Sequence, residues 1–377
     1  MANLTRTPAT QAGNGPRAGA TKTAAPVATR SFADAAVQHA GTIGYEVLEP
    51  LSTSQKMLRT LQVPSSGYLR AIVLLIELIP AANNGAFQAT FGSVADVLVN
   101  TGFDDVTGSS IISSMSGREL GTINSLGGHV GFGPAGVGAQ IDPLVAGGSA
   151  SATSSGFVRY PLEIGENDGY GAVANMDSAQ SYRIPIQLRA LSEIYSTVPT
   201  GGASVKITAI AESWLPPAAN GPDGVPNEQT PPALGTTQFH SKIVQPFAAG
   251  ENVRIPCPRV GNYLRSMYLW FGPSNGAPDE AYVPTTLRAE LNSRVLFNAP
   301  KSYLRHLTFE RCGLPLAALT PGLIFLDWAH EADGRVGYEN RTGYLPTAAS
   351  DDLSFYGTFA SSGAVTMIVN DIATAGA

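Results

Sequence analysis

The sequence predicts an all-β protein built from two tandem eight-stranded jelly rolls, with a short helix inserted in each roll and an arm and helix at the N-terminus. Three observations indicate this class. The 377 residues include 41 glycines and 27 prolines, which interrupt regular structure too often for a helical bundle. Apolar or alternating runs of strand length recur between those breaks. A pattern of identical residues also repeats between the two halves of the chain.

The first 30 residues form a basic arm with no acidic side chain, although the whole chain has a net charge of −6. The basic residues of the arm are Arg6, Arg17, Lys22 and Arg30. Because it is rich in Ala, Thr, Gly and Pro, the arm cannot bury enough apolar surface to order by itself, so we expect it to order only against a partner. Ser31 and Asp34 then match a capping box, which predicts a helix through about Ala40.

Eight strand-like runs follow in the first half, bounded by Pro, Gly, Asn and Ser. They lie at 43–49, 56–63, 67–79, 86–91, 94–99, 157–164, 181–189 and 203–215. The spacing of residues 110–126 predicts a short helix, and the Gly-rich stretch 127–156 predicts a long exposed loop. The run at 71–79, AIVLLIELI, is too short to span a bilayer and predicts a core strand.

Six prolines in residues 215–235 are typical of an extended connector between domains. A second series of strand-like runs follows it, at 239–247, 252–256, 261–271, 283–298, 322–328, 351–359 and 363–372, with a helix-like segment at 300–312. The predicted organisation is an arm and helix at 1–42, a first roll at 43–215, a connector at 216–238 and a second roll at 239–377.

The repeat between the halves is an ordered series of identities. At a constant offset of 195, Arg59, Tyr68, Leu69, Arg70 and Leu74 align with Arg254, Tyr263, Leu264, Arg265 and Leu269. Further matches join Val97 and Asn100 to Val295 and Asn298, Gly121 to Gly313, and the E-x-D-G sequences that begin at Glu166 and Glu331. The order indicates a duplicated unit. Eight short strands per unit favour a jelly roll; an immunoglobulin-like pair is the alternative, which the inserted helices fit less well.

Enzymatic chemistry finds little support in the residue pattern. Two jelly rolls could form a metal-dependent bicupin enzyme, but the five histidines include no HxH, HExxH or other close pair. Residues 131–136 match GxGxxG, yet Pro134 lies inside the motif and no helix follows. Residues 272–276 match the GxSxG elbow around Ser274, but Pro278 follows, so we interpret them as a turn. We therefore expect no catalytic residue, no cofactor and no metal site.

The charged residues and cysteines are interpreted as structural. Four acidic groups could hold calcium or act as catalytic pairs, but solvated loop faces explain them better. These groups are Asp104–Asp105, Glu163/Glu166/Asp168, Glu331/Asp333 and Asp351–Asp352. Basic residues are dispersed among strands and outnumbered by acids, so we expect no sequence-specific nucleic-acid binding. Cys257 and Cys312 are expected to be free thiols, and nothing at the N-terminus resembles a secretion signal.

An arm and helix, two jelly rolls joined by a Pro-rich connector, and a helix in each roll together resemble the double jelly-roll major capsid proteins of tectivirus-like bacteriophages, which are tailless and enclose an internal membrane. The stretch RYPLEIGENDGYGAVANMDSAQSYRIPIQL at 159–188 is similar to the segment that leads into a late strand of the first roll in that family. The resemblance covers nearly the whole chain.

That resemblance implies a viral structural protein, made in the host cytoplasm and located in the virion shell. It implies a homotrimer whose six rolls form a pseudo-hexagonal tile of an icosahedral capsid, in contact with neighbouring trimers and with minor and vertex capsid proteins. The basic residues Arg6, Arg17, Lys22 and Arg30 would lie on the inner face, near the lipid membrane. The alternative interpretation is a phage spike or carbohydrate-binding protein made of two β-sandwiches.

Overall fold

A computed structural model describes residues 29–81, 88–89, 94–127, 153–164, 168–274, 276–312, 321–329 and 340–373. Several predictions fall outside these residues: the positions of Arg6, Arg17 and Lys22, the GxGxxG match, nearly all of the Gly-rich stretch and the Glu331/Asp333 group. Within the described part of the chain, no helix is long and apolar enough to cross a membrane.

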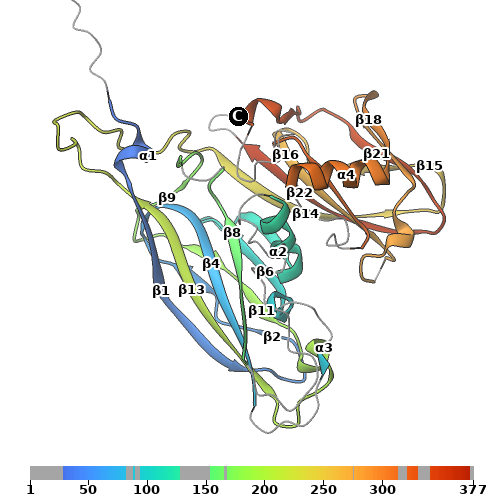
Figure 1. The fold of residues 1–377 in the computed structure, drawn as a ribbon, viewed down its shortest axis with the longest axis horizontal. Helices are drawn as coiled ribbons and strands as arrows, with labels where there is room; N and C mark the ends of the chain where they lie inside the picture. Colours follow the sequence, from blue (N-terminus) through green and yellow to red (C-terminus); the bar gives the residue numbers. More distant parts are fainter. Residues whose placement is uncertain are drawn as a thin grey trace, which may run out of the picture.

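The first roll consists of two facing antiparallel sheets (Figure 1). One sheet has the order β1 (Val37–Pro50), β13 (Ala203–Leu215), β4 (Gly67–Pro80) and β8 (Ser154–Pro161), and β9 (Val173–Asn175) also pairs with β4. The other contains β7 (Ser110–Met115) and β6 (Leu98–Asp104), followed by β10 (Tyr182–Ile184) with β3 (Leu61–Val63), and by β11 (Ile186–Leu188) with β2 (Lys56–Met57). The expected long strands at 56–63 and 181–189 are thus each broken in two.

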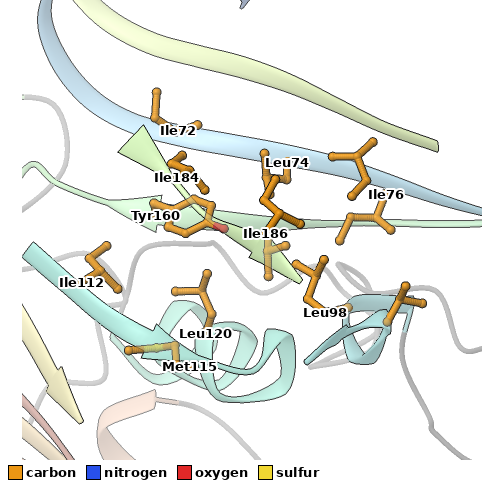
Figure 2. Close-up of a cluster of buried hydrophobic side chains, with 14 of the residues drawn as sticks. Ile72, Leu74, Ile76, Leu98, Ile112, Met115, Leu120, Tyr160, Ile184 and Ile186 are labelled. Carbon is orange, nitrogen blue, oxygen red and sulfur yellow. The ribbon is translucent and has the colours of Figure 1, made fainter. Parts of the chain in front are cut away.

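Side chains from both sheets fill the space between them (Figure 2). Ile72, Leu74 and Ile76 alternate along β4 and face β6, β7 and α2 (Gly117–Leu126), and all three are fully buried. Two-residue periodicity in the sequence therefore places one face of β4 in the core. Tyr160 lies in the same core, where its hydroxyl is hydrogen bonded to Thr101 and burial raises its pKa.

The second roll repeats the strand order of the first. Its first sheet is β14 (Thr237–Phe247), β22 (Gly363–Ala373), β16 (Tyr263–Gly272) and β19 (Leu323–Asp327), with β20 (Leu345–Pro346) beside β16. Its second sheet is β15 (Gly250–Cys257), β21 (Leu353–Phe359), β17 (Thr286–Leu291) and β18 (Arg294–Pro300). The chain therefore has the predicted all-β fold of two jelly rolls, in which β14, β22, β16 and β19 correspond to β1, β13, β4 and β8.

Short elements connect these strands. They are α3 (Leu191–Ile194), the strand pair β5 (Gln88–Ala89) and β12 (Tyr195–Thr197), and the 3-10 helices η1 (Val94–Val97), η3 (Glu280–Tyr282) and η5 (Arg341–Gly343). The prediction of a strand at 94–99 is therefore wrong for residues 94–97, which form η1 before β6 begins.

Two of the predicted helices have different bounds in the structure. The segment 110–126 begins as strand β7, and α2 starts only after Ser116, whose hydroxyl and the Glu119 carboxylate form a reciprocal capping box. The first helix, α1 (Phe32–Ala35), ends well before Ala40 because residues from Val37 onward pair with β13. The predicted helix at 300–312 is confirmed as α4 (Lys301–Cys312).

Strand register confirms the repeat at offset 195 in a specific way. The pairing of β4 with β13 skips Arg70, since Leu69 pairs with Ser213 and Ala71 with Glu212. The pairing of β16 with β22 skips Arg265 at the same point of the strand. The same irregularity in both rolls makes these two arginines structural equivalents.

Other parts of the predicted alignment are wrong. Asn100 lies on β6, whose counterpart in the second roll is β17, whereas Val295 and Asn298 lie on β18. Gly121 lies in the middle of α2, whereas its predicted match, Gly313, comes in the sequence after Cys312, the last residue of α4. Single matches of this kind carry no register information, because nothing ties them to neighbouring identities in the same strand.

Candidate functional surfaces

The predicted arm residue Arg30 is tied to the connector. Its guanidinium is 2.9 Å from the Asp223 carboxylate, its backbone N–H donates to the Pro226 carbonyl, and its carbonyl accepts from the Glu228 N–H. The charge of Arg30 is therefore paired within the chain, while the other three predicted arm residues, Arg6, Arg17 and Lys22, lie outside the described residues.

Phe32 completes this attachment. Its ring is buried between Tyr68 and Trp214, at centroid distances of 5.5 and 5.9 Å with edge-to-face geometry. Gly169 lies so close that an added Cβ would be 3.2 Å from the Phe32 ring, which leaves little space for a side chain there. We call residues 30–36 the arm anchor, since they fix the point at which the preceding residues leave the folded body.

The two rolls meet through α2. The Tyr268 hydroxyl of β16 donates to the Ile123 carbonyl at 3.4 Å, and the Arg265 guanidinium donates to the Gly127 carbonyl at 3.1 Å. Gly127 ends α2, so a buried cation lies at the negative end of the helix dipole. On the solvent side, Lys242 forms an ion pair with Glu119 at 2.8 Å. The helix inserted in the first roll therefore holds the sheet of the second.

A buried histidine lies in the same junction. His240 of β14 is fully buried, and burial together with the positive charge of Arg265 lowers its pKa to about 3. It therefore stays neutral at any pH near 7. Its position beside β7, where it pairs in parallel with Ile112, makes β14 continuous with the second sheet of the first roll. The result is one sheet of eleven strands that runs through both rolls.

In the predicted acidic group at 163–168, Glu163 and Asp168 serve as internal partners, and the burial of Glu163 corrects its interpretation as part of a solvated loop face. The buried Glu163 carboxylate accepts from Arg70 at 2.6 Å, and its pKa is raised because burial outweighs that interaction. Asp168 pairs with Arg341 of the second roll, whose guanidinium also lies 3.7 Å from the Tyr170 ring centroid. These contacts link the two rolls near the connector.

The two other acidic groups that lie within the described residues, Asp104–Asp105 and Asp351–Asp352, stabilise loops. Asp105 accepts hydrogen bonds from the backbone N–H groups of Thr107 and Ser109, both at 2.8 Å. Asp352 binds Arg254 at 2.7 Å, and Asp351 accepts from Asn292. No group of three or more metal-ligating side chains occurs among the described residues.

The GxSxG match is a turn, as predicted. The Gly276 N–H donates to the Pro273 carbonyl at 3.1 Å, and Ser274 lies at the edge of a cavity of about 440 Å³ between the rolls. Asp96, Arg118, Glu119 and Lys242 also line this cavity, where Arg118 pairs with Asp96 and Lys242 pairs with Glu119. Among the described residues that line the cavity, none is a histidine that could activate a serine.

The first sheet of each roll has a face that points away from its own core. The two faces are equivalent, but only one of them is covered by another part of the chain. On the second roll, the face that meets α2 carries Tyr268, Trp270, Leu323, Phe325 and Ile368, all buried. Strand pairing places Val73, Leu75, Phe157, Arg159 and Ile210 at the same positions of the first roll. These are only partly buried. We call Val73, Leu75, Phe157 and Ile210 the open sheet face.

The two inserted helices also differ in how far they are covered. Both sides of α2 are covered, one by its own roll and one by the second roll. In contrast, α4 buries Leu304 and Thr308 but leaves Tyr303 51% and Phe309 43% exposed. A largely apolar cavity of about 170 Å³ opens beside Tyr303 and Leu307. We call Tyr303, Leu307 and Phe309 the α4 surface.

Sequence reasoning missed the open sheet face. The run AIVLLIELI predicts a core strand, but Val73 and Leu75 point away from that core. The signal was present: an antiparallel strand that is apolar on both faces needs cover on both sides.

Comparison with known proteins agrees with this architecture. No family model and no curated protein matches the chain. Among solved structures, the STIV major capsid protein aligns with a TM-score of 0.58 at 10% identity, over 90% of this chain and 97% of that one. The PBCV-1 virus capsid gives 0.58 at 11% identity, over 93% and 96%. The major capsid protein of bacteriophage PM2 gives 0.52 at 10% identity, over 88% and 98%. The chain therefore has the fold of double jelly-roll major capsid proteins of viruses.

Proposed function

We propose that this chain is the major capsid protein of a virus, a structural protein without catalytic activity that forms pseudo-hexagonal homotrimers in an icosahedral shell. The observation that carries the proposal is that the two rolls differ in which of their equivalent surfaces are covered. Each chain contains one complete contact between a helix and a sheet, made by α2 and the second roll. It also leaves the equivalent partners, the α4 surface and the open sheet face, uncovered.

These two surfaces cannot meet within one chain, because they lie on different rolls whose other sides are already joined. In a second copy, the open sheet face can cover the α4 surface of the first. Such a contact joins two different surfaces and is therefore heterologous, and heterologous contacts form a closed ring when the rotation between copies permits it. Three copies would bring six rolls together, with every inserted helix against a sheet. A chain with only 14% charged residues suits a subunit surrounded by copies of itself.

The arm is the proposed contact with an internal membrane. The arm anchor, the connector and the end of β22 all lie at one end of the molecule (Figure 1). Arg30 is engaged by Asp223, so the attraction to anionic lipid would come from Arg6, Arg17 and Lys22, at roughly 1 kcal/mol for each basic residue near the surface. This end would face the interior, where minor and vertex capsid proteins are further proposed partners.

We also propose the four-part organisation predicted from the sequence, with two adjustments to its bounds. The first roll would run from the start of β1 at Val37, and the connector would end where β14 begins at Thr237. The tectivirus-like character of the virus, its tailless particle and synthesis in the host cytoplasm belong to the same proposal.

Light-scattering mass tests the oligomer. A trimer of 39.2 kDa chains should have a mass of about 118 kDa. Tyr303→Asp places a charge on the α4 surface at an exposed position, where folding should not suffer, and should convert trimers to monomers. Val198→Asp is the matched control, because Val198 is 43% exposed and lies on neither surface.

Two results would contradict the proposal. A wild-type chain that stays monomeric at micromolar concentration would argue for the spike or carbohydrate-binding alternative. A trimer that survives Tyr303→Asp as well as it survives Val198→Asp would mean that the subunits meet elsewhere.

A further inference from the structure

We propose that β1 of one copy pairs in parallel with β18 of the next, so that the β-sheets continue across the boundary between subunits. This inference rests on the proposed trimer and adds to it a specific contact between backbones. It concerns the exposed edges of the sheets, whereas the trimer was argued from the apolar faces.

The chain already makes this kind of contact once, within itself. Strand β7 precedes α2 in the first roll, and β14 is the first strand of the second roll. They pair in parallel at Ile112 and His240, which makes the sheets of the two rolls continuous. The strand edge and the docking of α2 on the second sheet therefore belong to the same junction.

The counterparts of these two strands each have an edge without a partner strand. Strand β18 precedes α4 as β7 precedes α2, and among the described residues it pairs with β17 alone. Strand β1 begins the first roll as β14 begins the second, and in the described part of the chain it pairs with β13 alone. An edge strand with backbone donors and acceptors open to solvent readily accepts another strand. Val295 on β18 and Val37 on β1 are exposed apolar side chains at these edges.

Strand register predicts which residues would pair. In the first roll, Gln38 pairs with Trp214, which pairs with Tyr68. In the second roll, Gln238 pairs with Ile372, which pairs with Tyr263. Counting from these ladders, Ala40 is the equivalent of His240. Ile112 lies five residues before the start of α2, and the same spacing before α4 reaches Leu296. The expected contact is therefore Ala40 of one copy with Leu296 of the next.

Two details of β1 agree with this register. The pairing of β1 with β13 shifts between Thr42 and Glu46, with Gly44 at a φ of +69°, so β1 is irregular beyond Thr42. The contact should then be confined to residues 37–42, which include Ala40. By the same counting, Thr42 and Tyr303 replace the ion pair of Lys242 and Glu119. Neither Thr42 nor Tyr303 is charged, so the proposed contact between copies brings no charge repulsion at this point.

Disulfide trapping tests the pairing. In the full chain carrying Cys312→Ser, with the buried Cys257 left in place, Leu296→Cys is combined in turn with Gln38→Cys, Ala40→Cys and Thr42→Cys. Under mild oxidation the Ala40 pair should give the most dimer and trimer bands on a non-reducing gel. Leu48→Cys with Leu296→Cys is the control, because Leu48 lies beyond the irregular stretch of β1 and is exposed.

Mass measurements on the same samples separate the two proposals. Trimers without any crosslink at residues 38, 40 or 42, or with crosslinks from Leu48 instead, would overturn the strand pairing and leave the capsid proposal standing. Monomers in the parent chain that carries Cys312→Ser alone would overturn both proposals. Hydrogen exchange gives an independent readout on the wild-type chain: amides of 38–42 and 294–298 should be protected in the trimer and exposed in the Tyr303→Asp monomer. Equal exchange in the two states would also overturn the pairing.

Discussion

Two isoleucines at equivalent positions provide a direct test of how the rolls differ. Ile368 of β22 pairs with Tyr268, and Ile210 of β13 pairs with Val73, so the two occupy the same place in their sheets. The first roll covers Ile368 completely, while Ile210 on the open sheet face is only partly buried. The same substitution to alanine should therefore have different consequences at the two sites.

The expected magnitudes follow from burial. Removing a fully buried isoleucine side chain costs about 2–5 kcal/mol, because transfer free energy is lost and a cavity remains. Ile368→Ala should lower the free energy of unfolding by that amount at every protein concentration. Ile210→Ala removes a partly exposed side chain and should cost only about 1 kcal/mol in the monomer. Its larger effect should be on association, since the open sheet face would be buried in the trimer.

Urea unfolding over a hundredfold range of protein concentration separates the stability of the monomer from the free energy of association, because only association depends on concentration. The Ile368→Ala shift should be constant across the range. The Ile210→Ala shift should grow as the protein becomes concentrated enough to form trimers. If the two variants lose the same stability with the same concentration dependence, the argument that one face is covered within the chain and the other between chains is wrong.

Three further predictions concern the arm anchor, a surface carboxylate and the arm. Phe32→Ala should destabilise the arm anchor by about 3–5 kcal/mol of local stability, seen as faster proteolysis after Arg30, while Val198→Ala should change nothing. Burial alone would raise the pKa of Glu280, but hydrogen bonds from Arg305 and Lys301 hold it at about 2, below its ordinary value of 4.5. The stability from this carboxylate is therefore present above pH 4.5 and lost as the pH falls toward 2. Since Glu280 is 41% exposed, solvent screening reduces the effect, and Glu280→Gln should cost only about 1 kcal/mol at pH 7 in thermal unfolding, a gap that closes by pH 2. A gap independent of pH would contradict this. Finally, replacing Arg6, Arg17 and Lys22 by alanine should abolish co-sedimentation with anionic lipid vesicles, and Arg30→Ala should not; equal losses would show that Arg30 also binds lipid.

Much of the architecture was open to prediction from the sequence. The regular spacing of strand-like runs and turn residues determined the fold class, because two-residue periodicity and Gly or Pro breaks act over a few residues. The identities around Arg70 and Arg265 located the same strand irregularity in both rolls. The segment 110–126 shows the limit of such local patterns, since a strand and a helix follow each other within it and only the capping box at Ser116 and Glu119 marks the boundary.

The candidate surfaces depended on contacts between distant parts of the chain. The sequence near Val73 indicates a strand that is apolar on both faces. It does not indicate that α2 covers Tyr268 and leaves Val73 open, because α2 lies far from both along the chain. The same holds for Arg30, whose charge looked available for lipid until the structure placed Asp223 beside it. Local periodicity and repeated residues determined that there are two like rolls. Only the tertiary structure decided which surfaces those rolls use on each other, because burial depends on which distant segments come into contact.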